Sequence, residues 1–318
     1  MNSICKSKTL IILCAALAFN CTNRQSAFKF VQNEQGIELL ENNQRILFYQ
    51  KAVKTIDGKF ARNNYIHPLY TLSGDTLTED FPDDSPSSHL HHRGIFWAWH
   101  QLYAGKQNLG DGWELEDFII DIVALNAQAA AEHATINIKA TWQSPNFQNK
   151  KPYIEENTAI TVYPTTRNTR IIDFEIALLA LVPEVRIGGS NDDKGYGGFS
   201  ARIKMPDGLI FTGESGTVTP QRLQISAGSW MDFSAPYEKS GELSGLTILC
   251  HPSLPNFPQP WILRQKKSMQ NPVFPGEKPI SLSMDKPIIL RYRLVLHKGD
   301  ANVSEITKWQ AEYAETTF

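Results

Sequence analysis

Hydrophobic and polar residues alternate with a period of two over several stretches of the chain. In residues 134–142 apolar side chains occupy every second position and end at Trp142, with threonine, asparagine and lysine between them. The same alternation runs through residues 170–178 and 290–296. Such alternation is typical of a strand with one face buried and the other in solvent. The pattern therefore predicts half-buried β-strands at these three places.

Turn-forming residues separate neighbouring stretches of this alternating pattern. Residues 36–50 predict two strands joined at Glu41-Asn42-Asn43, because asparagine tolerates the positive φ of a tight hairpin turn. Residues 163–169 provide a second polar turn. Strands at short intervals, broken by proline and glycine, predict a large antiparallel β-sandwich rather than alternating β-α units.

Only the end of the chain has the residue spacing of a helix. Asn302 is a capping residue, and Ile306, Trp309 and Tyr313 follow at intervals of three and four. We therefore expect a short C-terminal helix on an otherwise all-β fold. The sequence has no internal repeat and no linker, which predicts one domain over residues 22–318.

The N-terminal residues 1–21 predict an export signal. Lys6 and Lys8 precede an apolar run, residues 10–19, that is too short to span a bilayer. Cleavage by a signal peptidase is one outcome, and lipidation of Cys21, as in a bacterial lipoprotein, is the other. We therefore expect a periplasmic protein, or one anchored to the membrane by that lipid.

The composition excludes several classes of partner and cross-link. The chain has 31 Lys and Arg against 33 Asp and Glu, a net charge of −2, and loses two lysines with the signal. A nucleic-acid-binding protein needs a basic patch, which this sequence lacks. Removal of residues 1–21 also leaves Cys250 as the remaining cysteine, so no intrachain disulfide is expected in the mature protein.

Polar chemistry is concentrated in residues 67–99, which contain four of the eight histidines. His89, His91 and His92 lie close enough in sequence to be candidate ligands of a divalent metal, and no other cofactor is indicated. Histidine also titrates near neutral pH, so His67, His91 and His92 are candidate acid or base groups. A third interpretation is that the rings bond only to loop backbone. Further metal ligands would come from His67, His100, His251 or Asp80.

Candidate substrate-binding residues follow the histidines. Arg93, counted with the candidate catalytic residues, presents a fork of donors that fits a carboxylate or a pair of sugar hydroxyls. Trp97, Trp99 and Trp113, with Phe96 beside them, are candidates for stacking on a sugar, although aromatic residues in a sandwich are more often part of the core. The sequence therefore indicates a carbohydrate as the partner.

Weaker signals lie further along the chain. The glycine-rich segment 188–199 lacks the strand and helix context of a nucleotide-binding loop. Its glycines indicate a turn or a close backbone approach, with Lys194 and Tyr196 as candidate contacts. Asp232 and His251 are polar groups at predicted strand ends and, with His89 and Arg264, are further candidates for substrate binding. Asp232 or Glu214 is also a candidate carboxylate. The sequence contains no G-x-S-x-G, H-E-x-x-H, Walker or C-x-x-C motif, which weakens the serine-hydrolase, zincin, nucleotide and redox interpretations.

Several ordered motifs resemble one family over most of the mature chain. They are HPLY, the DFP after Glu79, HLHHRGIFWAW, KGYGGFSAR, the HP at 251 with Asn256, Trp261 and Arg264 after it, and LRYRLVLHKGD. The chain resembles the PmoA-like family of exported bacterial proteins, whose name echoes methane monooxygenase although this sequence has no matching membrane helices. The resemblance implies a β-sandwich comparable with the galactose-mutarotase supersandwich and a role in carbohydrate metabolism.

The resemblance also implies a set of functional positions. The polar motif of the family falls here on His67, His89, His91, His92, Arg93, Lys194, Asp232, His251 and Arg264. The family usually has an acidic residue and a proline where this chain has Ser88 and Leu90. A role for that carboxylate would pass to Asp80, Asp83 or Asp84.

The sequence as a whole predicts an exported carbohydrate-active enzyme. Hydrolysis or elimination at a glycoside or an oxidised sugar is the first hypothesis, with His92 or His67 moving a proton and Arg93 holding the substrate. Epimerisation or mutarotation of a sugar is the second. A non-catalytic glycan-binding lipoprotein, with its tryptophans as a stacking platform, is the competing class.

Overall fold

The computed structural model describes residues 27–81, 89–237, 239–266, 268–300 and 302–318. The predicted signal peptide and Cys21 lie outside these residues, as do Ser88, Asp83 and Asp84. Within the described residues, no helix is long and apolar enough to cross a membrane.

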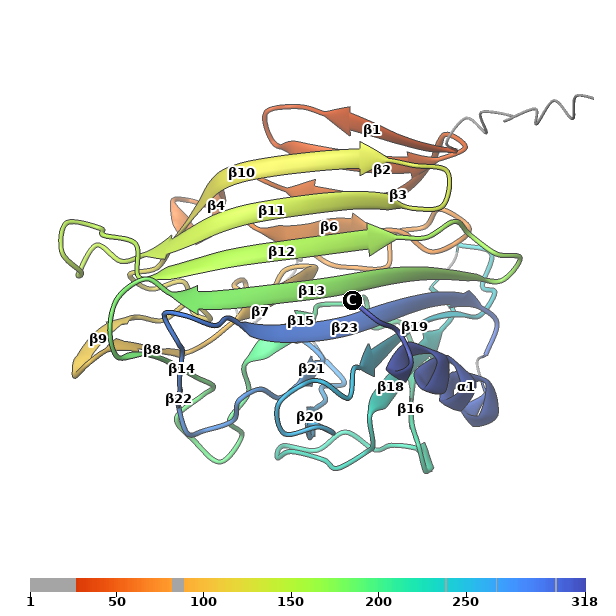
Figure 1. Ribbon diagram of the computed structural model, residues 1–318. Helices are drawn as coiled ribbons and strands as arrows, with labels where there is room; N and C mark the ends of the chain where they lie inside the picture. The colour runs from red at the N-terminus through yellow and green to blue at the C-terminus, as the bar shows by residue number, and fades with distance from the viewer. Residues whose placement is uncertain (1–26, 82–88, 238, 267, 301) are drawn as a thin grey trace, which may run out of the picture.

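A long antiparallel sheet forms one layer of the molecule (Figure 1). Among the described residues it has nine strands, in the spatial order β10 (Ile119–Ala129), β11 (Ala134–Gln143), β12 (Ile154–Val162), β13 (Thr169–Ala180), β23 (Ile288–Lys298), β19 (Ser244–Cys250), β18 (Trp230–Ala235), β16 (Ile210–Gly213) and β17 (Gly216–Thr217). The predicted strands at 134–142, 170–178 and 290–296 are β11, β13 and β23. Along β11, every second residue from Ala134 to Trp142 is buried, as the alternating pattern predicted.

A second antiparallel sheet lies behind the first (Figure 1). Within the described ranges its strand order is β1 (Phe28–Gln32), β2 (Gly36–Glu41), β3 (Gln44–Gln50), β6 (Tyr65–Leu69), β7 (Ile95–Ala98) and β15 (Gly198–Ala201). The predicted hairpin is β2 and β3, and Asn42 and Asn43 between them have φ of 50° and 65°. Two asparagines with positive φ match the twist of the paired strands.

Shorter strands extend the two layers. One small sheet pairs β22 (Ile280–Ser281), β14 (Val185–Gly188), β8 (Gln101–Ala104) and β9 (Gln107–Gly110). Two ribbons pair β20 (Trp261–Ile262) with β21 (Asn271–Pro272) and β4 (Lys54–Ile56) with β5 (Lys59–Arg62). The predicted C-terminal helix is α1 (Val303–Ala314), where the Asn302 side chain accepts a hydrogen bond from the Glu305 amide and Ile306 and Tyr313 are buried. The all-β antiparallel sandwich with a short C-terminal helix is thereby confirmed.

The main core lies between the two large sheets and contains a buried carboxylate. Glu156 on β12 is fully buried and accepts hydrogen bonds from the indole nitrogens of Trp97, at 2.9 Å, and Trp142, at 2.8 Å. It also accepts one from the Asn64 amide at 2.8 Å. Burial raises the pKa of Glu156, and these donors act in the opposite direction. The network joins the two sheets through polar contacts inside an apolar core.

A second, smaller core lies on the other face of β7. Along that strand Ile95 and Trp97 enter the main core, whereas Phe96 and Ala98 enter the smaller one, because successive side chains of a strand point in opposite directions. The smaller core also contains Tyr65, Trp113, Ile262, Met269 and Val273, with Tyr196 packed at its margin. The candidate site is built on this smaller core.

Candidate functional site

A single glycine brings the histidine loop against the six-stranded sheet. Gly94 has φ of +52°, and a Cβ atom there would lie 1.9 Å from the backbone oxygen of Ile66. Only glycine allows this approach. The Gly94 amide donates to the Glu79 carbonyl at 2.8 Å, and its own carbonyl accepts from the Arg202 amide at 2.7 Å. These two hydrogen bonds therefore hold the C-terminal end of the loop formed by residues 89–93.

Arg93 holds this loop to the rest of the fold, and its side chain points into the protein interior. Its side chain is fully buried and donates hydrogen bonds to the backbone carbonyls of Lys54, Phe60 and Leu90. It also stacks on Phe81, with its guanidinium carbon 3.6 Å from the ring centre. The expectation that Arg93 binds substrate is wrong, because its donors are consumed by the fold.

Three histidine rings converge at the start of the loop. One ligand atom from each of His89, His91 and His92 lies within 4.8 Å of the other two. The ring centres of His91 and His92 are 4.2 Å apart, and His89 stacks on His92 at 5.1 Å. His89 is exposed, whereas His91 and His92 are buried. The group is thus open to solvent on the side of His89.

His91 is held by a carboxylate from another loop. Its Nδ1 lies 3.1 Å from Oε2 of Glu114. Burial lowers the pKa of His91 to about 3, with help from the positive charge of Arg62, so the ring is neutral at pH 7. The contact then joins a neutral imidazole and a carboxylate and is not an ion pair. A proton on Nδ1 suits this contact, because a carboxylate can only accept, and it leaves the Nε2 lone pair free.

His92 is fixed in the tautomer with the proton on Nδ1 by a tryptophan. The indole nitrogen of Trp113 donates a hydrogen bond to Nε2 of His92 at 3.0 Å, and an indole can only donate. Burial holds the pKa of His92 well below its usual value, so the neutral ring carries its proton on Nδ1, 3.5 Å from the hydroxyl of Ser268. Trp113 thereby occupies the free lone pair of His92.

One aspartate organises the turn that supplies both Trp113 and Glu114. Oδ1 of Asp111 accepts hydrogen bonds from the amides of Trp113, at 2.8 Å, and Glu114, at 2.9 Å. Its other oxygen lies 2.8 Å from Nδ1 of His100. The Nε2 atom of His100 is buried and has no hydrogen-bond partner among the described residues. The His100 ring also stacks on Trp113, with the ring centres 5.4 Å apart.

Positive charges surround the three rings. Burial and then the charge of Arg202 lower the pKa of His89, and the charges of Arg264 and Lys194 act in the same direction with smaller effect. Arg202 is fully buried and bonds Glu79 at 2.8 Å, but its two terminal nitrogens have no hydrogen-bond partner in the described part of the chain. Arg62, also buried, has a pKa lowered to about 9 by burial and by Arg93. The site therefore keeps its imidazoles neutral.

The predicted stacking tryptophans do not form an exposed platform. Trp97 and Trp99 lie in the main core, where Trp97 bonds Glu156 and the Trp99 indole donates to the Phe274 carbonyl at 2.9 Å. Trp113 is fully buried under His92. This part of the prediction is wrong, because all three rings are buried, Trp97 through the alternation along β7. Tyr196 is the half-exposed aromatic ring here, 5.0 Å from both Trp113 and His100.

Two other predicted residues lie close to the histidine loop. Arg264 and Lys194 line a shallow depression, together with Pro220, Gln221, Arg222, Leu263 and Gln265. The charges of both residues act on His89. Lys194 pairs with Asp192 at 2.8 Å, and Arg264 donates to the carbonyls of Gln221, Arg222 and Leu263. These side chains form the basic margin of the site.

The remaining predicted residues have partners of their own. His67 contacts Thr78 at 3.0 Å, and burial lowers its pKa to about 4. Asp232 is fully buried against His297 at 2.9 Å, so its predicted role in substrate binding is wrong.

His251 and Glu214 serve the ends of strands. His251 bonds Ser253 at 2.8 Å and packs on Tyr313 of α1. Glu214 accepts hydrogen bonds from the amide and hydroxyl of Ser229. The structure gives each of these two side chains a local bonding role.

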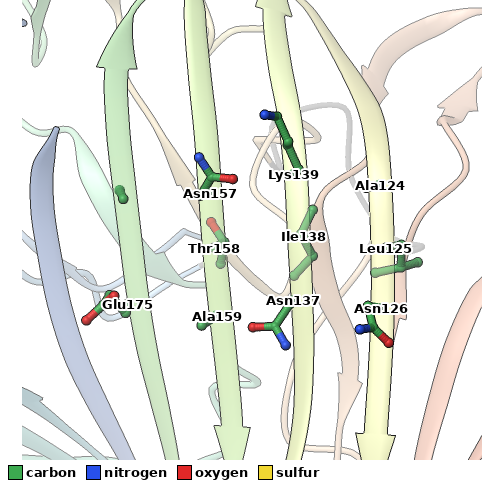
Figure 2. Close-up of a pocket in the computed structure, with 11 residues that line it drawn as sticks. Ala124, Leu125, Asn126, Asn137, Ile138, Lys139, Asn157, Thr158, Ala159 and Glu175 are labelled. Atoms are coloured by element: carbon green, nitrogen blue, oxygen red, sulfur yellow. The ribbon is translucent and has the colours of Figure 1, made fainter. Parts of the chain in front are cut away.

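A hollow on the outer face of the nine-stranded sheet contains fewer side chains suited to catalysis than the histidine loop does. Figure 2 shows Asn126, Asn137 and Asn157 on neighbouring strands of this face, with Lys139 and Glu175 beside them. None of its lining residues is a histidine or an aromatic residue. Reactive side chains therefore concentrate at the histidine loop and not here.

Sequence reasoning missed Glu114, Asp111 and Arg202. The signal for the first two was the Asp111-Gly-Trp-Glu114 turn, in which carboxylates flank an already suspected tryptophan. Arg202 ends the KGYGGFSAR motif but gives no sign in sequence that its guanidinium is buried with unpaired nitrogens.

The fold and site define an all-β protein with a histidine-rich loop. The chain belongs to the family of unknown function DUF6807, whose model matches residues 36–310. No curated protein matches it in sequence. Among solved structures it is similar to a candidate mutarotase (YeaD) from Salmonella typhimurium, with 10% identity and a TM-score of 0.39 over 85% of this chain and 90% of that one. At this TM-score the overlap assigns neither a fold nor an activity to this chain.

Proposed function

We propose that this protein is an exported enzyme that acts on a carbohydrate at the loop of His89, His91 and His92, by hydrolysis or elimination at a glycoside or an oxidised sugar. The observation that carries the proposal is the convergence of three imidazoles next to the Glu114 carboxylate. His89 is the exposed ring and meets a substrate first. Imidazole and carboxylate side chains within hydrogen-bond reach are the groups that move protons in such reactions.

The margin of the site supports a sugar as substrate. Tyr196 offers a half-exposed ring for the apolar face of a sugar, and Arg264 and Lys194, whose charges act on His89, add donors in a neighbouring depression. A surplus of donors favours a ligand rich in oxygen, including one with a carboxylate.

The burial of the tryptophans favours an enzyme over a glycan-binding module. A stacking platform requires exposed rings, and Trp97, Trp99 and Trp113 are at most 2% exposed. Epimerisation or mutarotation at the same histidines is the alternative reaction.

Membership of the PmoA-like family and export belong to the same proposal. They are supported by the motifs of the sequence and by the lysines and apolar run that precede Cys21. Mass spectrometry of the protein from membranes tests lipidation, with Cys21→Ala as the control. A lipid mass that persists in Cys21→Ala would contradict lipidation at this residue.

The catalytic proposal is tested by NMR spectra of glycosides, 3-keto-glycosides and free aldoses incubated with the purified protein. We expect new sugar signals with the natural sequence and a rate lower by about 10²–10⁴-fold in His91→Ala. His133→Ala, a change at a histidine outside the site, is the matched control and should keep full activity. Sugar binding without turnover in every mixture would overturn the enzyme and favour the binding module.

A further inference from the structure

The first step concerns the geometry of the three rings. Ligand nitrogens on one tetrahedral zinc, at about 2.0–2.1 Å from the metal, lie roughly 3.4 Å apart. The nitrogens of His89, His91 and His92 already lie within 4.8 Å of one another, so the largest gap must close by about 1.4 Å. Side-chain rotation of the exposed His89 provides such a movement.

The second step concerns the support behind His91. Metal-bound histidines usually donate their other ring N–H to a carboxylate or carbonyl, which fixes the tautomer and orients the ring. The carboxylate of Glu114 lies in the place of such an acceptor, 3.1 Å from Nδ1 of His91, and Nε2 is on the other side of the ring. Asp111 in turn fixes the amide of Glu114. Glu114 and Asp111 can therefore orient His91 as a metal-coordinating residue.

The third step concerns His92. Its Nε2 lone pair accepts the indole N–H of Trp113, so in this arrangement the lone pair is occupied and Nδ1 carries the proton. A metal can recruit His92 only by displacing that hydrogen bond.

The positive charges around the three histidine rings are partly neutralised, so a divalent cation can bind there. Arg202 pairs with Glu79, and Lys194 pairs with Asp192, which reduces the positive field at the loop. Glu114 and Asp111 add negative charge on the other side. Arg62 and Arg264 remain positive, so we expect moderate affinity rather than a closed structural site.

We propose that His89, His91 and His92 bind one divalent transition-metal ion of the zinc class, and that Trp113 competes with this ion for His92. Imidazole ligands suit zinc, copper, iron and nickel, and three of them leave a position open for a substrate oxygen. The proposal shares its site with the proposed carbohydrate chemistry, but metal binding itself does not depend on the sugar.

The test is a titration of the full, chelator-treated protein with Zn²⁺ followed by calorimetry, and with Co²⁺ followed by visible absorption. We expect one equivalent to bind, with affinity at least about tenfold weaker in His89→Ala and His91→Ala and unchanged in His133→Ala. His89 is exposed, so His89→Ala does not threaten folding. Trp113→Phe removes the competing N–H and should bind more tightly.

Each outcome bears on a defined part of the proposal. Absence of binding, or equal affinity in His89→Ala and His133→Ala, overturns the site. An unchanged or weaker affinity in Trp113→Phe overturns the competition for His92. Turnover of a sugar by protein that binds no metal would overturn the metal site and leave the proposed function standing. Metal binding without turnover of any sugar would support the metal site and overturn the proposed function.

Discussion

Two buried histidine groups of this protein have opposite electrostatics. At the loop, burial holds the pKa of His91 and His92 low, and the rings stay neutral. On β23, burial also opposes the charged form of His297, but the hydrogen bond and charge of Asp232 outweigh it and raise its pKa. Both nitrogens of His297 face acceptors, Asp232 at 2.9 Å and the Gly299 carbonyl at 3.2 Å.

The difference between the two groups shows how a structural buried histidine differs from one that can bind a ligand. Asp232 is itself fully buried and is held by Ser234 and Thr247, so the charged pair completes a closed network. Glu114 is half-exposed, and the loop rings around it keep unused bonding capacity on the open side. A closed network stabilises the fold, whereas an open one remains available to a ligand.

The largest effect on stability is expected for Asp232→Ala. Loss of this carboxylate leaves His297 buried without its counter-charge, which should lower the free energy of unfolding by about 3–5 kcal/mol. Urea denaturation measures it, with the exposed Asp285→Ala as the control. A loss below about 1 kcal/mol would contradict the structural role of the pair.

Trp97→Phe is expected to act on stability alone. Removal of the indole N–H takes one donor from the buried Glu156 carboxylate and should cost about 1–3 kcal/mol in unfolding free energy. Thermal denaturation and sugar affinity are measured together, with the half-exposed Trp309→Phe as the control. Weaker sugar binding in a still folded Trp97→Phe would restore the stacking role that the structure denies.

The pH dependence of the two groups should have opposite signs. Because the pKa of His297 is raised, its stabilising contribution is full below the unfolded value near 6.5 and is lost as the pH rises through the folded value. The pKa of His91 is lowered to about 3, so its contribution is present above 6.5 and is lost as the pH falls toward 3. NMR titration of the imidazole signals in the metal-free protein should show His297 charged and His91 neutral at pH 5. The same charge state for both would remove the contrast.

The smallest effect on stability is expected for Glu114→Gln. The carboxylate is half-exposed, so its loss should change the unfolding free energy by less than about 1 kcal/mol. Metal affinity should nevertheless fall about 10–100-fold, because the support of His91 is weakened. Chemical denaturation and calorimetry give the two values, and Glu116→Gln at an exposed neighbour is the control. Equal metal affinities in the two variants would place Glu114 outside the site.

The strands and the helix could be predicted because local patterns specify them. Alternation along β11, paired asparagines between β2 and β3, and the Asn302 cap of α1 each depend on residues within a few positions. The sequence also indicated the histidine loop, since His89, His91 and His92 are neighbours in the chain. These features follow from the period of a strand, the φ of a turn and the free amides at a helix start.

Only the tertiary structure decided what each side chain of the loop does. Arg93 looks like a ligand-binding fork in sequence, but carbonyls 33 and 39 residues away consume its donors. Trp97 and Phe96 are neighbours that enter different cores, and the sequence does not say which face of β7 meets the nine-stranded sheet. Glu114 reaches His91 from a turn 23 positions later in the chain. Local propensity acts over a few residues, whereas burial and hydrogen bonding depend on segments that only folding brings together.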